Sequence, residues 1–258
     1  MSRVLSCDDE LLFKQPESTH LGDCPICSLP IPIAASQDKV RYTTYPCCSK
    51  VVCDGCVYAN CLRENEANLQ PSCPFCRQPT PTTGEGFLLK LKKRIGANDP
   101  VALDIEGARH TLAGDHLTAI DHYEKAAGLG SIQSHYNLAA AYHKVAGAEM
   151  DIKIYTYHME QAAIGGHALA RYNLGLIERR KGNKQRAVKH WIIAANLGHD
   201  RSIKTLKDCY AQGVVSKGDF AAALRAHHVA VNATKSPQRD AAQVAQKMGR
   251  WNVDVPSI

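Results

Sequence analysis

The chain has 258 residues, of which 45% are hydrophobic and 22% are charged, and it carries a formal net charge of +6. This composition is typical of a globular protein and excludes the collagen-like and intrinsically disordered classes. No stretch approaches the roughly 18 apolar residues that cross a bilayer. Acidic residues begin at Asp8, before the apolar core of a secretory signal peptide. We therefore expect no membrane span and an intracellular, cytoplasmic or nuclear, location.

The first part of the chain divides into a polar segment and a cysteine-rich segment. Residues 1–22 lack a clear periodicity and are expected to be a flexible N-terminus. The segment 23–78 follows, and it contains nine of the eleven cysteines. In a reducing compartment, clustered cysteines more often bind metal than form disulfides. This segment is therefore predicted to be a small metal-binding domain.

The spacing of these cysteines predicts two zinc ions. The cluster consists of three Cys-x-x-Cys pairs and one adjacent pair: Cys24 and Cys27, Cys53 and Cys56, Cys73 and Cys76, and Cys47 with Cys48. A Cys-x-x-Cys pair directs two thiolates at one ion, and a structural zinc takes four ligands. Three pairs supply six ligands, so a second zinc needs the adjacent pair. Cys61 is either a competing ligand or a buried thiol on a short helix.

Two of the pairs have the residue types of a known family. Cys24-Pro25-Ile26-Cys27 and Cys73-Pro74-Phe75-Cys76-Arg77 resemble the first and last knuckles of RING fingers, and the resemblance covers residues 24–77. It implies a small α+β module with interleaved zinc sites. The implied ligand sets are Cys24, Cys27, Cys53 and Cys56 for one zinc, and Cys47, Cys48, Cys73 and Cys76 for the other. Lys50 stands where this family often has a histidine, and a protonated lysine cannot bind zinc, so the all-cysteine variant is favoured.

The same resemblance implies a function. RING fingers act as E3 ubiquitin-protein ligases, which hold a ubiquitin-charged conjugating enzyme in a reactive pose and form no covalent intermediate. The docking contacts of the family fall on Ile26 and Pro74, and its linchpin falls on Arg77. Many active members carry a bulky apolar residue where this chain has Asn60. The alternative is a non-catalytic zinc-binding adaptor, so enzymatic activity is left open.

A linker and a helix are expected over residues 79–99. Pro79, Pro81 and Gly84 favour turns, and an apolar stripe from Phe87 to Ile95 then predicts a connecting helix. Asp99 and Pro100 together predict the start of the next helix, as its N-cap and its first residue.

Residues 100–235 contain an internal repeat. The pattern Ala-Ala-x-x-Gly begins at Ala126, Ala162 and Ala194, with spacings of 36 and 32 residues. Each copy ends a helical segment, and a glycine there suits a left-handed C-cap. Turns are expected at Gly114, Gly182 and Gly218, with a longer turn near Gly147. We predict four helix-turn-helix units that stack into an all-α solenoid; an irregular alanine-rich bundle is the alternative.

The repeats resemble Sel1-like repeats, which are relatives of the tetratricopeptide family. This resemblance implies an extended surface that recruits a protein substrate or assembly partner. The whole excess of positive charge lies after residue 99, and we attribute it to solvated helix faces, so no nucleic acid is expected as a partner. Eleven of the twelve histidines also lie there. Because they lack paired ligand spacing, we expect them at exposed or hydrogen-bonded positions. Residues 236–258 are expected to be a C-terminal tail.

Overall fold

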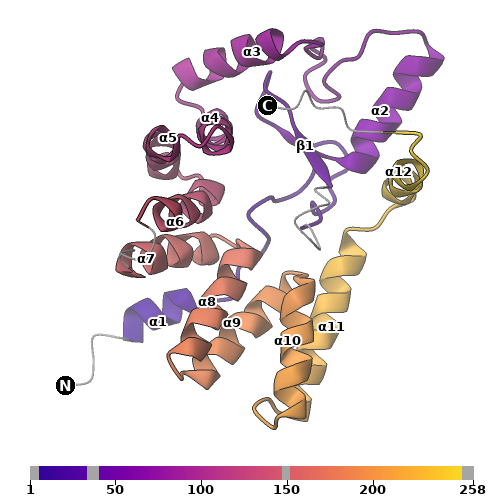
Figure 1. Ribbon diagram of the computed structural model, residues 1–258. Helices are drawn as coiled ribbons and strands as arrows, with labels where there is room; N and C mark the ends of the chain where they lie inside the picture. Colours follow the sequence, from indigo (N-terminus) through magenta and orange to yellow (C-terminus); the bar gives the residue numbers. More distant parts are fainter. Residues whose placement is uncertain (1–5, 34–40, 147–151, 252–258) are drawn as a thin grey trace.

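A computed structural model of the chain describes residues 6–33, 41–146 and 152–251. Twelve helices and one two-stranded sheet occur within these residues (Figure 1). In chain order they are α1 (Ser6–Leu12), β1 (Tyr42–Thr44), β2 (Val51–Cys53), α2 (Asp54–Glu66), α3 (Gly84–Gly96), α4 (Pro100–Leu112), α5 (His116–Gly128), α6 (Ile132–Ala146), α7 (Ile152–Ile164), α8 (Ala168–Arg180), α9 (Lys184–Asn196), α10 (Asp200–Ala211), α11 (Lys217–Ala233) and α12 (Pro237–Lys247). The small α+β module and the helical part match the coarse prediction.

The cysteine module, residues 23–80, is built on a short hairpin and one helix. Strands β1 and β2 pair antiparallel, with Thr43 opposite Val52, and α2 follows β2 directly. The core contains few apolar side chains besides cysteine, and these include Ile31, Tyr45 and Val57. A core of this size contributes little stability by itself, so bound metal would supply much of the folding free energy.

The predicted helix pairs are present. They are α4 with α5, α6 with α7, α8 with α9, and α10 with α11, and adjoining pairs pack on one another. Gly130, Gly166 and Gly198 have φ between 86° and 91°, as a left-handed C-cap requires. The turn expected at Gly218 lies earlier, because Ser216 caps α11 by accepting from the Asp219 N–H at 3.0 Å. The turn expected near Gly147 lies outside the described residues.

Two glycines show why small residues recur on the first helix of a pair. A Cβ on Gly107 would lie 2.6 Å from the ring of Tyr123, and one on Gly175 would lie 2.3 Å from the indole nitrogen of Trp191. Both contacts join the two helices of one pair, α4 with α5 and α8 with α9. A glycine at this position therefore lets an aromatic side chain from the second helix pack directly against the first helix.

The prediction of a flexible N-terminus is wrong for the described part of residues 1–22. Leu12 is buried among Met159, Ala162 and Leu174. The Phe13 ring contacts the His190 ring, with centroids 4.7 Å apart. The segment lacks a repeating apolar pattern because it follows the surface of α7, α8 and α9 and depends on single anchor residues.

The prediction of a C-terminal tail over residues 236–258 is also wrong for its described part. Helix α12 begins after Ser236, whose hydroxyl accepts from the Arg239 N–H at 3.3 Å. It packs on α2 of the cysteine module. Gly55 on α2 allows this approach, since a Cβ there would lie 2.7 Å from the Arg239 side chain.

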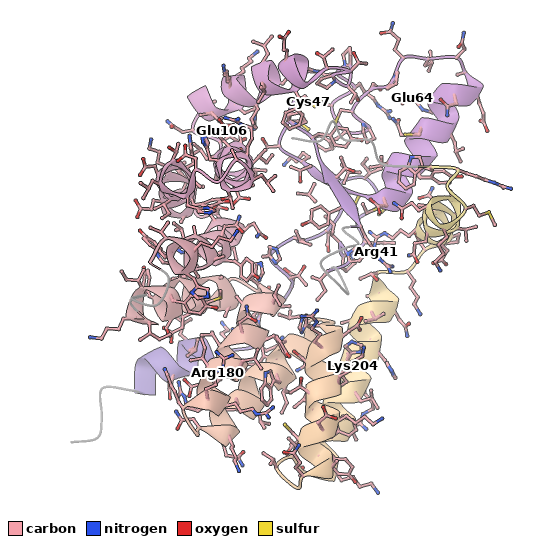
Figure 2. The ribbon with its side chains drawn as sticks, in the orientation of Figure 1. Arg41, Cys47, Glu64, Glu106, Arg180 and Lys204 are labelled. Carbon is pink, nitrogen blue, oxygen red and sulfur yellow. The ribbon has the colours of Figure 1, made fainter. Side chains whose placement is uncertain are left out.

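The helix pairs form an arc with the cysteine module on its inner side (Figure 1). Helix α3 lies at one end of the arc, and α12 returns from the other end to the module. Figure 2 shows Cys47 in the module and Glu106 on the first helix pair. Within the described residues, the longest and most apolar helices still fall short of what crossing a bilayer requires.

Candidate metal centre

The eight predicted ligands lie in the two predicted groups of four. Cys24, Cys27, Cys53 and Cys56 form one group, and Cys47, Cys48, Cys73 and Cys76 form the other. Within the groups, the Sγ separations are 3.9 Å for Cys24 and Cys56, 3.8 Å for Cys27 and Cys53, 3.8 Å for Cys48 and Cys73, and 3.4 Å for Cys47 and Cys76.

These separations fit tetrahedral zinc. Sulfur atoms about 2.3 Å from a central ion lie about 3.8 Å from one another at the corners of a tetrahedron. A disulfide would instead require about 2.05 Å, and these cysteines are free thiols. The donor sets are thus suited to zinc, and each supplies four ligands, which leaves no open position for a water molecule or substrate.

Three turns of the same form present the ligands. The Ser28 N–H donates to the Cys24 carbonyl at 2.8 Å, and the Arg77 N–H donates to the Cys73 carbonyl at 2.9 Å. The Ser49 N–H donates in the same way to the Tyr45 carbonyl at 2.8 Å. All three donor residues have positive φ.

The adjacent cysteine pair therefore lies in a knuckle with one change. Tyr45 takes the place of the first cysteine, Cys48 takes the place of the second, and Cys47 supplies the remaining thiol. This explains how an adjacent pair replaces a Cys-x-x-Cys pair at the second site.

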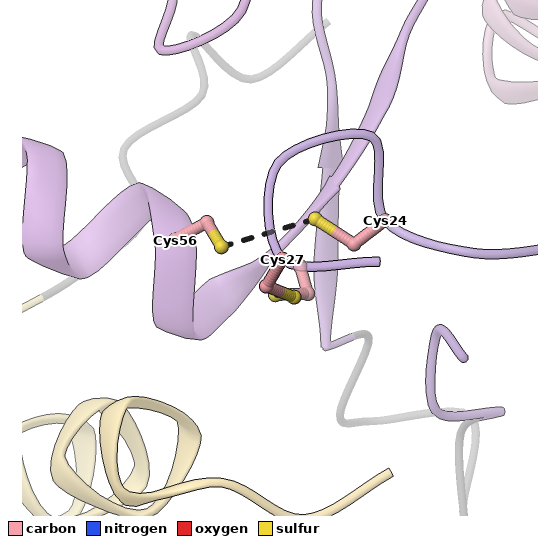
Figure 3. Close-up of side chains that lie close together, drawn as sticks. Cys24, Cys27 and Cys56 are labelled. Carbon is pink, nitrogen blue, oxygen red and sulfur yellow. Dashed lines mark hydrogen bonds between the residues drawn. The ribbon is translucent and has the colours of Figure 1, made fainter. Parts of the chain in front are cut away.

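The first cysteine group is the more deeply buried, and it receives a hydrogen bond from the far end of the chain. Cys56 lies in the first turn of α2, and it faces Cys24 and Cys27, which lie between α1 and β1 (Figure 3). Arg239 on α12 is only 4% exposed and donates to Cys27 Sγ at 3.4 Å. Its guanidinium also donates to the carbonyls of Leu29 and Pro30 at 3.1 and 2.7 Å. A cationic donor beside a thiolate opposes the negative charge of a four-cysteine site.

The second cysteine group has a different environment. The Lys50 ammonium, at the position where a histidine ligand is common, lies 5.8 Å from the centre of the Phe75 ring. Burial raises the pKa of Cys47 and raises that of Cys48 to about 11. A metal that binds the Cys47 and Cys48 thiols displaces their protons.

Asp54 lies at the start of α2, next to Cys53 of the first group. Burial raises the pKa of the Asp54 carboxyl to about 6.

Cys61 lies outside both groups. It sits on α2, half-buried against the module core, where Trp251 also packs. The Trp251 ring contacts the Tyr58 ring, with centroids 5.1 Å apart. Cys61 thus fits the interpretation as a packed thiol, and burial raises its pKa.

The residues expected to dock a conjugating enzyme differ in exposure. Ile26 is 43% exposed, and so is Phe75 on the other knuckle. Pro74, in contrast, is buried. Apolar surface is therefore available at both knuckle tips, although on the second knuckle Phe75 presents it in place of Pro74.

Asn60 connects α2 with the second knuckle. Its Oδ1 accepts from Arg77 Nη1 at 3.0 Å and from Arg63 Nη2 at 3.1 Å. Its Nδ2 donates to the Ser72 carbonyl at 3.1 Å. The position is 8% exposed, so Asn60 positions Arg77 and presents no apolar surface.

Sequence reasoning missed the contribution of the C-terminal segment. Arg239 and Trp251 contact the cysteine module across about two hundred residues of sequence. Neither residue stands in a motif, and no local pattern indicates these contacts. No model of a known protein family matches this chain, and no curated protein matches its sequence.

Proposed function

We propose that the protein is a zinc-binding RING-type E3 ubiquitin-protein ligase. The observation that supports this most is the interleaving of the two cysteine groups. The first and third cysteine pairs along the chain share one group, and the second and fourth share the other. In this proposal the zinc ions are structural, and the module enhances ubiquitin transfer by positioning a conjugating enzyme.

Arg77 is the residue that we assign to ubiquitin transfer. It follows the last ligand directly, it is exposed, and it has a φ of 62°. Asn60 holds one of its guanidinium nitrogens. Among the described residues no hydrogen bond engages the other donors of the planar guanidinium, so they can bridge two protein surfaces, for which arginine is well suited.

The test is the discharge of ubiquitin from a panel of charged conjugating enzymes by the zinc-loaded full chain. We expect Arg77→Ala and Ile26→Ala to slow discharge at unchanged zinc content. Arg63→Ala is the matched control, because Arg63 donates to the same Asn60 oxygen but lies outside the knuckles. An absence of stimulated discharge with every enzyme of the panel contradicts the proposal.

One observation favours a second candidate, a non-catalytic zinc-binding adaptor. The Asn60 side chain is committed to three hydrogen bonds, at a position where many active RING fingers carry a bulky apolar group. An adaptor would hold two zinc ions and bind no conjugating enzyme. A pull-down of the conjugating-enzyme panel with the zinc-loaded chain distinguishes the two candidates.

We also propose that the helix pairs are Sel1-like repeats that recruit a protein substrate. The supporting observation is the regular stacking of four pairs. The surface around α7, α8 and α9 is covered by the chain's own N-terminal segment, where Asp9 pairs with Arg186 at 2.5 Å. A recruited partner would therefore bind elsewhere on the arc.

A further inference from the structure

A second set of metal-ligand side chains lies outside the cysteine module, on the first helix pair. Glu106 and His110 are four residues apart on α4 and so share one face. His122 comes from α5, and its ring stacks on that of His110, with centroids 5.4 Å apart and an interplanar angle of 16°. The three ligand atoms lie within 4.8 Å of one another. The fold therefore assembles histidines that looked scattered in the sequence.

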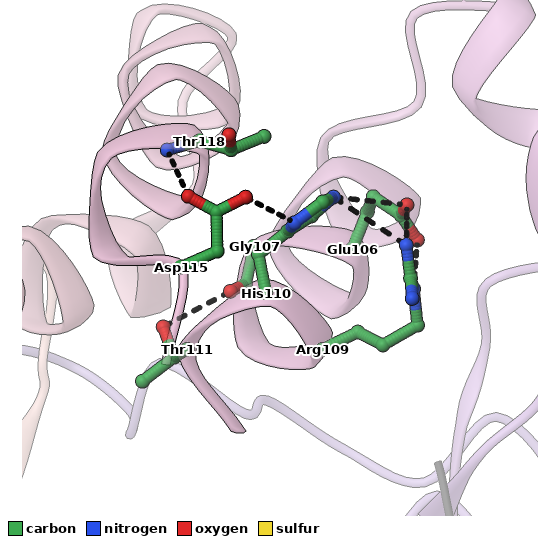
Figure 4. A network of polar contacts seen from close by, with 7 residues as sticks. All are labelled: Glu106, Gly107, Arg109, His110, Thr111, Asp115 and Thr118. Atoms are coloured by element: carbon green, nitrogen blue, oxygen red, sulfur yellow. Dashed lines mark hydrogen bonds and ion pairs between the residues drawn. The ribbon is translucent and has the colours of Figure 1, made fainter. Parts of the chain in front are cut away.

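A hydrogen bond to Asp115 orients the His110 ring. Its Nδ1 lies 3.2 Å from Asp115 Oδ2, and the other Asp115 oxygen accepts from the Thr118 N–H at 3.2 Å (Figure 4). A donating Nδ1–H leaves the Nε2 lone pair free, and Nε2 lies 3.5 Å from Glu106 Oε1. A carboxylate behind the ring orients histidine ligands in many metal sites.

A cationic group already lies between two of the ligands. Arg109 Nη2 is 2.7 Å from Glu106 Oε1 and 3.4 Å from His110 Nε2. The Arg109 side chain is 34% exposed, so it can move out into solvent. His122 Nδ1 is enclosed and has no hydrogen-bond partner among the described residues. A metal ion bound by the three side chains would replace the guanidinium.

We propose that Glu106, His110 and His122 form a third metal site, which binds a divalent transition cation of the Zn²⁺ class and which Arg109 occupies until the metal displaces it. Two imidazoles and one carboxylate favour Zn²⁺ over Mg²⁺ or Ca²⁺. Nitrogen and oxygen ligands about 2.0 to 2.1 Å from zinc lie roughly 3.4 Å apart. The ligand atoms lie within 4.8 Å of one another, so binding requires them to approach by up to about 1.4 Å. The ion would join α4 to α5 and keep one coordination position open.

The test is calorimetric titration of Zn²⁺ into the full chain that already holds two zinc ions. We expect one further equivalent, which Glu106→Gln and His122→Gln abolish. Asp115→Asn keeps an oxygen to cap α5 and should weaken the third equivalent about 10- to 100-fold. Arg109→Gln should strengthen it. The exposed His228 supplies the matched control, His228→Gln, which should change nothing.

Two further measurements keep the result interpretable. Circular dichroism establishes that each variant is folded, and the imidazole NMR signals should shift on Zn²⁺ addition for the ligand histidines and not for His228. The proposal is overturned if the third equivalent is absent. It is equally overturned if binding persists unchanged in both Glu106→Gln and His122→Gln, which would place the ion elsewhere.

Discussion

Replacing Arg239 with alanine should loosen one zinc site and leave the other intact. The buried guanidinium donates to the carbonyls of Pro30, Leu29 and Thr234 at 2.7, 3.1 and 2.6 Å. Two of these carbonyls, Pro30 and Leu29, belong to the module, whereas Thr234 directly precedes α12 in the chain. Hydrogen bonds of a charged donor contribute about 1.5 kcal/mol or more each, so the loss of the two bonds to the module should destabilise the contact between α12 and the module by about 3 kcal/mol. The fourth bond, to Cys27 Sγ, contacts the first cysteine group directly. Loss of such an outer contact typically costs about 10- to 100-fold in metal affinity.

The assay is zinc release to a chromophoric chelator, followed over time for the full chain. In Arg239→Ala, one zinc per chain should be released at a chelator concentration about 10- to 100-fold lower, and the second should behave as in the wild type. Arg239→Lys separates charge from geometry, because a lysine retains the charge without the planar fork. Arg250→Ala is the control, since Arg250 is exposed. Equal loosening of both zinc ions, or of neither, would refute the reasoning.

Three further predictions concern stability. Gly175→Ala places a methyl group 2.3 Å from the Trp191 indole nitrogen, and it should lower the free energy of unfolding, measured by urea titration, by about 1 to 3 kcal/mol. Gly96 has open space around it, so the control Gly96→Ala should be neutral or stabilising. Burial raises the pKa of Asp104 from 3.8 to about 6, so the folded state holds that proton more tightly than the unfolded state. The Asp104 contribution should therefore fall by about 3 kcal/mol as pH rises from about 4 to 6, and a pH-independent difference between the wild type and Asp104→Asn would contradict this. Chelation of zinc should remove amide-exchange protection from residues 23–80 while much of the helical circular dichroism remains; protection that survived complete zinc removal would show that metal is not needed for the fold of the module.

The cysteine groups were predictable because the spacing within each pair is a local feature of the sequence. A Cys-x-x-Cys pair must fold as a knuckle to bring two thiolates to one ion, so Cys24 with Cys27 and Cys73 with Cys76 indicate their own geometry. The pairing of the two groups followed from a family resemblance, and the distances agree with it. The turn that presents Cys47 and Cys48 was not predictable, because its first position is Tyr45 and not a cysteine, so it does not form a Cys-x-x-Cys pattern.

The ends of the chain show the opposite case. Leu12 and Arg239 each hold a terminal segment against a surface formed by residues far away in the sequence. A few anchor residues leave no clear periodic pattern in residues 1–22, which were therefore expected to be flexible. Ser236 and Pro237 carry a helix-start signal like that of Asp99 and Pro100, but nothing local indicates that the helix packs on the module, and residues 236–258 were expected to be a tail. The same reason hid the metal-ligand set of Glu106, His110 and His122, because its third member comes from a different helix.

The sequence by itself determined the cysteine knuckles and the helix pairs, since these depend on spacings of a few residues or on a period of 32 to 36. Only the tertiary structure decided that the module lies inside the arc, that α12 covers α2, and that Arg239 reaches the first cysteine group. Those contacts depend on the curvature of four stacked pairs, which accumulates over the whole arc and is not encoded at any one position.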